Sequence, residues 1–206
     1  MRPDERPSCP WQQESVPAGT CSESGAEVVQ LTSAPLIHSH IYPEAPVFTP
    51  DSRFFVYARF RAPDEPHEYW LCEVGSWRLF RLTQESPVSG PVVGADGEHL
   101  YYVSERRPRV ILLIRLHLAS LRREELAVAE GVTRPYPLGT MSPDGRYYAT
   151  RVFPADAAAS ILRFDVKTGE ARVIHSHPEI FNAHMQWEPG RGHDILIQHN
   201  RGGVLD

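Results

Sequence analysis

Hydrophobic residues follow this chain in short alternating runs, separated by turn residues. The clearest case is residues 46–60, PVFTPDSRFFVYARF, in which a Pro-Asp-Ser turn joins a short strand to a strand rich in aromatic residues. Such turns supply the backbone conformations of a tight hairpin. The pattern recurs from Pro91, as PVVGADGEHLYYVSE, and from Gly139, as GTMSPDGRYYATRVF. The chain is therefore expected to be all-β and to be built from repeated hairpins.

The spacing of these hairpins defines a repeat. The turn residues Asp51, Asp96 and Asp144 lie 45 and 48 residues apart, and residues 185–199 form a weaker fourth copy. Each of the first three copies is followed by a second strand pair, such as residues 161–166 and 171–174. Four strands in a period of this length are typical of a β-propeller blade.

The predicted fold class is therefore an all-β propeller of four-stranded antiparallel blades, about three and a half of which are present. The polar, Pro-rich residues 1–25 are expected to form a disordered tail, and residues 26–206 the partial propeller. The predicted blades are residues 40–83, 89–129 and 136–175, with half a blade at 181–206.

Residues 110–130 also suit a helix, because their later part is rich in helix-favouring residues. The alternation of Leu112, Ile114, Leu116 and Leu118 instead favours a strand, a turn at residues 120–123 and a second strand.

Net charge, apolar stretches and cysteine content argue against several classes of partner and site. The net charge of −5 gives no reason to expect nucleic acid or an anionic membrane as a partner. The longest apolar stretch, residues 110–114, is too short to span a bilayer. The three cysteines, Cys9, Cys21 and Cys72, have neither metal-ligand spacing nor an even count, so we expect reduced thiols and a cytoplasmic protein.

Four stretches of the chain resemble the oligogalacturonate lyases of polysaccharide lyase family 22. They are SGAEVVQLTSAPLIHSHIYPEAPVFTPDS, LYYVSERR, ILRFDVKTGEARVI and NAHMQWEPGRGHDILIQHNRGGVLD. The resemblance implies a seven-bladed ring that cleaves short oligogalacturonides in pectin breakdown by β-elimination, with a divalent metal such as Mn²⁺. It places the catalytic arginine, the histidine base and the His/Gln metal ligands after Asp206, so no catalytic or metal-binding residue is assigned within this chain. The short link at residues 153–160 departs from the longer insertion of the bacterial enzymes.

Substrate-binding candidates are His38, His40, His184, His199 and Arg201. His38 and His40 would share one face of an extended strand, and His184 and His199 flank the fourth hairpin. The alternative is that these are solvated rim histidines, and His175 and His177 are interpreted as surface residues. Six arginines make blade two basic, which by default indicates a solvated face. They are Arg106, Arg107, Arg109, Arg115, Arg122 and Arg123.

Two other functions compete with the lyase. One is a non-catalytic propeller that binds a protein or peptide, and the other is a truncated gene product. For a truncated product, the open ring predicts poor solubility or self-association, through the apolar side of residues 26–32 and the unpaired edge of blade four.

Overall fold

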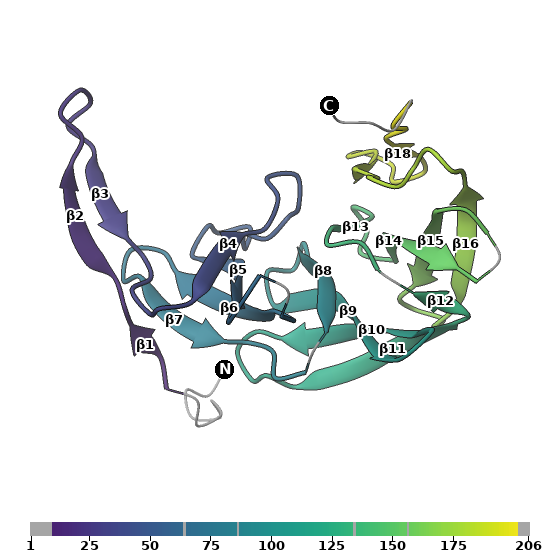
Figure 1. The fold of residues 1–206 in the computed structure, drawn as a ribbon, viewed down its shortest axis with the longest axis horizontal. Coiled ribbons are helices and arrows are strands. Elements are labelled where there is room, and N and C mark those ends of the chain that lie inside the picture. Colours follow the sequence, from purple (N-terminus) through teal and green to yellow (C-terminus); the bar gives the residue numbers. More distant parts are fainter. Residues whose placement is uncertain (1–9, 64, 86, 134, 156, 202–206) are drawn as a thin grey trace.

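The computed structural model describes residues 10–63, 65–85, 87–133, 135–155 and 157–201. All regular structure in these ranges is β-strand. Figure 1 shows antiparallel sheets following one another along an arc, the arrangement of blades in a propeller. Within the described ranges there is no helix of the length and apolarity that a membrane crossing requires.

The first sheet, blade one, has the order β1-β7-β6-β5-β4, and the second, blade two, has the order β11-β10-β9-β8. The strands of blade one are β1 (Gln12–Gln13), β4 (Ile37–His40), β5 (Phe54–Phe60), β6 (Glu68–Glu73) and β7 (Arg78–Arg81). Those of blade two are β8 (Val88–Val93), β9 (His99–Arg107), β10 (Val110–His117) and β11 (Arg123–Glu130). Residues 110–130 are thus strand, turn and strand, as the alternation predicts.

The third sheet, blade three, has the order β12-β14-β15-β16, with β13 also paired to β14. Its strands are β12 (Val132–Thr133), β13 (Gly139–Met141), β14 (Tyr147–Pro154), β15 (Ser160–Asp165) and β16 (Ala171–Ser176). Two hairpins complete the described fold, β17 (Met185–Trp187) with β18 (Ile195–Ile197), and β2 (Val16–Thr20) with β3 (Glu27–Gln30). The β17–β18 hairpin begins blade four.

The innermost strand of blade one comes in two pieces. β4 pairs with the later half of β5, and residues 47–49 pair with its beginning, through a bridge between Phe48 and Phe55. The same division occurs in blade three, where β12 and β13 both pair with β14. The sequence pattern identified only the second piece of blade one, because residues 41–46 interrupt the hydrophobic alternation with Pro43 and Pro46.

The repeated aspartates form the turns, as predicted. The Asp51 carboxylate accepts hydrogen bonds from the Thr49 hydroxyl at 2.6 Å and the Arg53 N–H at 3.1 Å. Asp144 does the same with Ser142 and Arg146. These bonds hold the reversal between the two inner strands, which explains the Asp at each turn.

Apolar clusters lie between successive blades, and blades two and three approach most closely at their inner strands. The Tyr148 hydroxyl donates to the Gly90 carbonyl at 2.6 Å. A Cβ atom on Gly139 would lie 2.5 Å from that carbonyl oxygen and closer still to the Tyr148 hydroxyl. Only glycine fits where the two strands converge, which accounts for the glycine at the start of β13.

The chain before β4 differs from the expected disordered tail over residues 10–25. Gln12 and Gln13 pair with β7, and the Trp11 ring lies 5.3 Å from the Phe80 ring between centroids. β2 then pairs with β3, so residues 26–32 contribute to a hairpin. Trp11 explains the difference, because burying its large apolar surface favours order. Residues 1–9 lie outside the described residues.

Candidate functional site

His184 lies in a cluster that joins the beginning of the propeller to blade four. Its Nδ1 is 2.7 Å from Oε2 of Glu44, a residue 140 positions earlier in the chain. The His184 ring also meets the Tyr42 ring edge-on at 4.8 Å, and the Tyr136 ring lies 6.4 Å away. We call Tyr42, Glu44, Tyr136 and His184 the blade-bridging cluster. Tyr42 and Glu44 lie between the two pieces of the inner strand of blade one, Tyr136 lies between those of blade three, and His184 lies in the link that precedes blade four.

Contacts behind the blade-bridging cluster fix its position. The Tyr136 hydroxyl donates to Oδ1 of Asn182, and the Tyr136 N–H donates to the Arg151 carbonyl at 2.8 Å. The Arg151 guanidinium lies 4.7 Å from the centre of the Tyr136 ring. Burial raises the pKa of the Tyr136 hydroxyl and lowers that of Arg151. The tyrosine is therefore neutral at physiological pH and acts as a hydrogen-bond donor.

The pairing of His184 with Glu44 determines the chemistry available. With Nδ1 bonded to the carboxylate, Nε2 is left for a ligand. A neutral ring accepts a hydrogen bond or a proton at Nε2, whereas a protonated ring donates to an anion. Beside the cluster is a cavity of 220 Å³ lined by His40, Tyr42 and Tyr136 among others. This is below the roughly 300–1,000 Å³ of most small-molecule sites, so the cavity suits one end of a longer ligand.

The other predicted site residues lie in different surroundings. His38 lies 6.3 Å from the Tyr57 ring, and its Nε2 is buried without a hydrogen bond to any described residue. Burial, followed by the charge of Arg59, lowers the pKa of His38. His40 approaches the Ile41 carbonyl through Nδ1 at 2.7 Å and lines the 220 Å³ cavity.

His199 and Arg201 lie farther along the chain. His199 stands beside His177, with 4.7 Å between ring centroids, and Arg201 is an exposed turn residue. The five predicted substrate-binding residues therefore lie in different parts of the structure, and His184 is the one that belongs to the blade-bridging cluster.

Sequence reasoning missed Tyr42, Glu44 and Tyr136. Their partner His184 is up to 142 positions away, and no local spacing reports such a contact. A usable signal was the stretch IYPEAP, which breaks the strand pattern of blade one and carries an aromatic and an acidic residue. Loops held on a rigid scaffold are where binding residues concentrate.

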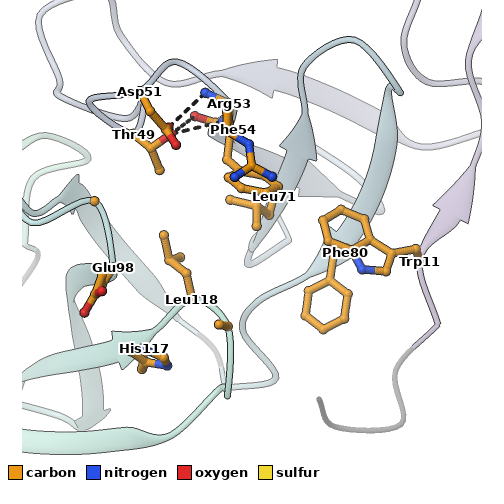
Figure 2. A pocket seen from close by; sticks show the side chains of 12 residues that line it. Trp11, Thr49, Asp51, Arg53, Phe54, Leu71, Phe80, Glu98, His117 and Leu118 are labelled. Carbon is orange, nitrogen blue, oxygen red and sulfur yellow. Dashed lines mark hydrogen bonds between the residues drawn. The ribbon is translucent and has the colours of Figure 1, made fainter. Parts of the chain in front are cut away.

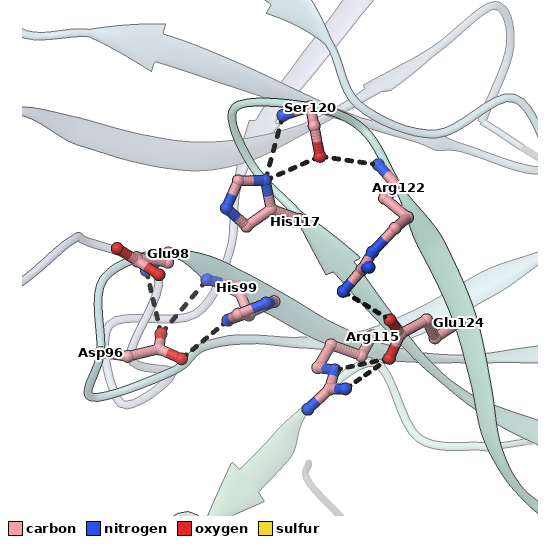
Figure 3. A network of polar contacts seen from close by, with 8 residues as sticks. All are labelled: Asp96, Glu98, His99, Arg115, His117, Ser120, Arg122 and Glu124. Atoms are coloured by element: carbon pink, nitrogen blue, oxygen red, sulfur yellow. Dashed lines mark hydrogen bonds and ion pairs between the residues drawn. The ribbon is translucent and has the colours of Figure 1, made fainter. Parts of the chain in front are cut away.

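The arginines of blade two are largely paired with glutamates. Arg115 and Arg122 both contact Glu124, and Figure 3 shows this arrangement beside His99 and His117. Arg123 contacts Glu85 at 2.8 Å and Glu125 at 3.0 Å. Arg106 and Arg107 have further glutamate partners, Glu125 and Glu130. Blade two therefore offers little free positive charge to a polyanion, in line with the solvated face expected by default.

A second cavity, of 300 Å³, lies between blades one and two (Figure 2). Its walls include Trp11, Phe54 and Phe80, while Asp51 at its rim is engaged in the turn with Thr49 and Arg53. Because the Asp51 carboxylate is engaged in the turn, the cavity is mainly apolar. Its lining residues provide no pair of titratable groups comparable to His184 and Glu44.

Comparison with known proteins defines the fold. No protein-family profile and no curated protein matches the sequence. A solved oligogalacturonate lyase in complex with manganese matches with a TM-score of 0.63 and 20% identity, over 82% of this chain and 48% of that one. The oligogalacturonate lyase of Vibrio parahaemolyticus matches over the same shares, with a TM-score of 0.61 and 17% identity. TolB from Acinetobacter baumannii matches over 89% of this chain and 45% of its own, with a TM-score of 0.55 and 18% identity.

The chain therefore spans about half the length of these structures. Similarity at this level of identity concerns the fold, and it includes propellers with different names. Together with the sheet order, it confirms the fold class predicted from the repeat: the chain is a partial β-propeller of the kind found in oligogalacturonate lyases.

Proposed function

We propose that this chain is the front part of an oligogalacturonate lyase-like protein and binds short oligogalacturonides at the blade-bridging cluster. The pairing of His184 with Glu44 carries the proposal, because it leaves Nε2 of the ring without a hydrogen bond to any described residue. Two other members of the cluster, Tyr42 and Tyr136, line the neighbouring cavity. Oligogalacturonides present hydroxyl and carboxylate groups, which Nε2 can bind in its neutral and protonated forms respectively. The four sequence stretches that resemble the lyases and the fold similarity to two of them support this substrate class.

The reaction itself needs groups beyond binding. In β-elimination a base removes the proton α to the uronate carboxylate, the bond from the β-carbon to the glycosidic oxygen breaks, and a double bond forms between the two carbons. Cationic groups stabilise the enolate-like charge that develops. The family resemblance places the arginine, the base and the metal ligands after Asp206. The proposed role of this chain is therefore to hold one end of the substrate.

Calorimetric titration of the 206-residue chain with trigalacturonate tests the proposal. Because a hydrogen bond to a charged group contributes about 1.5–3 kcal/mol, His184→Ala should weaken binding about tenfold or more. Glu44→Gln should have a smaller effect in the same direction, since the ring is kept but loses its charged partner. His193→Ala is the matched control, because His193 is an exposed histidine of the same blade. Equal affinities of the wild type and His184→Ala would contradict the proposal.

The second candidate is a non-catalytic binding propeller, because the fold similarity extends beyond the lyases to other propellers, including TolB over 89% of the chain. It predicts no saturable binding of trigalacturonate by the wild-type chain. The first titration therefore separates the two candidates before any variant is made.

A further inference from the structure

Three potential metal ligands converge at the junction of blades three and four. His177 follows β16, Glu179 lies two residues later in the link to blade four, and His199 follows β18. One ligand atom from each lies within 4.8 Å of the others. Sequence reasoning assigned no metal ligand to this chain and interpreted His177 as a surface residue; its side chain is 41% exposed.

Backbone contacts hold the two segments together. The Asn200 N–H, next to His199, donates to the Glu179 carbonyl at 2.6 Å. The His177 N–H donates to the Ala159 carbonyl at 3.0 Å, which ties the beginning of the link to blade three. Ile180, adjacent to Glu179, is completely buried. The three side chains therefore extend from backbone that is already fixed, which reduces the entropy lost when they bind an ion.

The distances suit a small cation after minor side-chain movement. Oε2 of Glu179 is 3.9 Å from Nδ1 of His177 and 3.9 Å from Nδ1 of His199. Ligands about 2.0–2.2 Å from a tetrahedral zinc ion are roughly 3.3–3.6 Å apart, so these two separations must shorten by about half an ångström. The ligand atoms of His177 and His199, which lie within 4.8 Å of each other, must approach by at most about 1.5 Å. His177 Nδ1 also accepts a long hydrogen bond, 3.2 Å, from the Glu179 N–H. Coordination through Nδ1 would replace that bond.

A fourth imidazole stands next to these three residues. The His175 ring lies 5.5 Å from that of His199 and is parallel to that of His177. Its Nε2 is buried and makes no hydrogen bond to the described part of the chain. Buried polar atoms are seldom left unpaired. The junction therefore has more nitrogen donors than its internal hydrogen bonds use.

We propose that His177, Glu179 and His199 form a binding site for a divalent transition-metal ion such as Zn²⁺. Two imidazoles and one carboxylate match the preference of zinc and its first-row neighbours, whereas Mg²⁺ and Ca²⁺ prefer oxygen ligands. Three protein ligands leave a coordination position for water or an anionic oxygen. The site is separate from the lyase metal centre implied by the resemblance, whose ligands are expected after Asp206, and it does not depend on the proposed function.

Titration of the full 206-residue chain with ZnCl₂ tests the site, with affinity measured by competition with a chromophoric chelator. The wild type should bind one equivalent. Loss of an outer-shell partner alone costs about 10–100-fold in metal affinity, so His199→Ala and Glu179→Gln, which remove direct ligands, should each cost about 100-fold. His193→Ala should bind as the wild type does. MgCl₂ at the same concentrations should not compete.

Co²⁺ provides a readout that distinguishes the ligand types. Nitrogen and oxygen ligands give weak visible ligand-field bands, whereas cysteine thiolates add an intense charge-transfer band in the near ultraviolet. His199 and Glu179 are partly exposed, so their variants should keep the thermal unfolding temperature of the wild type. The proposal is overturned if the wild type lacks a saturable site, if His199→Ala binds equally well, or if the thiolate band appears.

Discussion

The two ends of the arc are covered to very different extents. At the first end the chain before β4 lies over the open side of blade one, where Leu31 packs against a buried cluster. Glu14 forms an ion pair with Arg59 at 3.0 Å, and the Arg59 side chain is only 6% exposed. The guanidinium also lies 4.0 Å from the centre of the Trp70 ring. The buried residues covered here are Tyr57, Trp70, Cys72 and Leu79.

At the other end blade four contributes two strands of three residues each. Leu196 in β18 is 68% exposed, and Phe181 in the preceding link is 38% exposed. The apolar cluster here centres on Ile180, Ala183 and Met185. The comparison shows that an open propeller end can be covered by a segment of its own chain. In the described part of the chain no such segment lies over the blade-four end, where Leu196 and Phe181 are exposed beside the edge of β18.

The largest effect is expected from Ile180→Ala, which tests how much the blade-four end depends on its small cluster. Ile180 is completely buried, and truncation of a buried isoleucine typically costs about 2–5 kcal/mol. We expect a loss near the lower end of that range, about 2–3 kcal/mol, because the surrounding cluster is small enough to relax. Chemical denaturation followed by Trp fluorescence measures the change, since Trp187 packs against the cluster.

Leu196→Ala is the control for this prediction, because a leucine already in water should lose less than about 0.5 kcal/mol. If Ile180→Ala were equally harmless, blade four would not be packed onto blade three as described, and the comparison of the two ends would fail.

A smaller, pH-dependent effect is expected from Glu14→Gln at the covered end. Burial alone would raise the pKa of Glu14, but the hydrogen bond from the Ala34 N–H and the charge of Arg59 outweigh it, and the pKa is lowered. The stabilisation is therefore complete above the unfolded-state value of about 4.3 and is lost as the pH falls through the lower folded-state value. At neutral pH the variant should be less stable by about 1–2 kcal/mol.

Denaturation curves at about pH 7 and about pH 3 would show this difference shrinking in acid. Glu27→Gln, an exposed carboxylate on the projecting β2–β3 hairpin, should leave the stability unchanged at both pH values. A loss on Glu14→Gln that stays constant with pH would mean that the ion pair with Arg59 is not the cause.

The repeat made the blades predictable because each hairpin carries its own turn chemistry. Asp51, Asp96 and Asp144 each accept a hydrogen bond from a backbone N–H two residues later. Because the contact is local, the sequence of a single copy is enough to predict the turn. The order of residues 10–25 was not predictable in this way. Trp11 has an apolar partner, Phe80, some 70 residues away, and a Pro-rich polar stretch gives no local sign of it.

The candidate sites follow the same distinction between local and long-range contacts. His184 was identifiable from its place before the fourth hairpin, but its partner Glu44 comes from blade one. The motif HSHPE contains His177 and Glu179 at close spacing, yet the third ligand, His199, approaches only when β18 returns beside the link. The sequence indicated which residues to consider, whereas the packing of the blades in three dimensions determined which of them meet.

The smallest effect concerns association of the chain with itself, which we expect at the uncovered end. Burying Leu196 and its neighbours between two copies would remove apolar surface from water and pair the free edge of blade four. Leu196→Lys should raise the dimer dissociation constant several-fold without changing the unfolding free energy, as measured by sedimentation velocity over a concentration series. Val28→Lys, on the β2–β3 hairpin where Val28 is 47% exposed, makes the same kind of change near the other end. Disruption of association by Val28→Lys but not by Leu196→Lys would contradict this expectation. The interacting edge would then lie at the first end, and the segment that covers blade one would itself provide the contact.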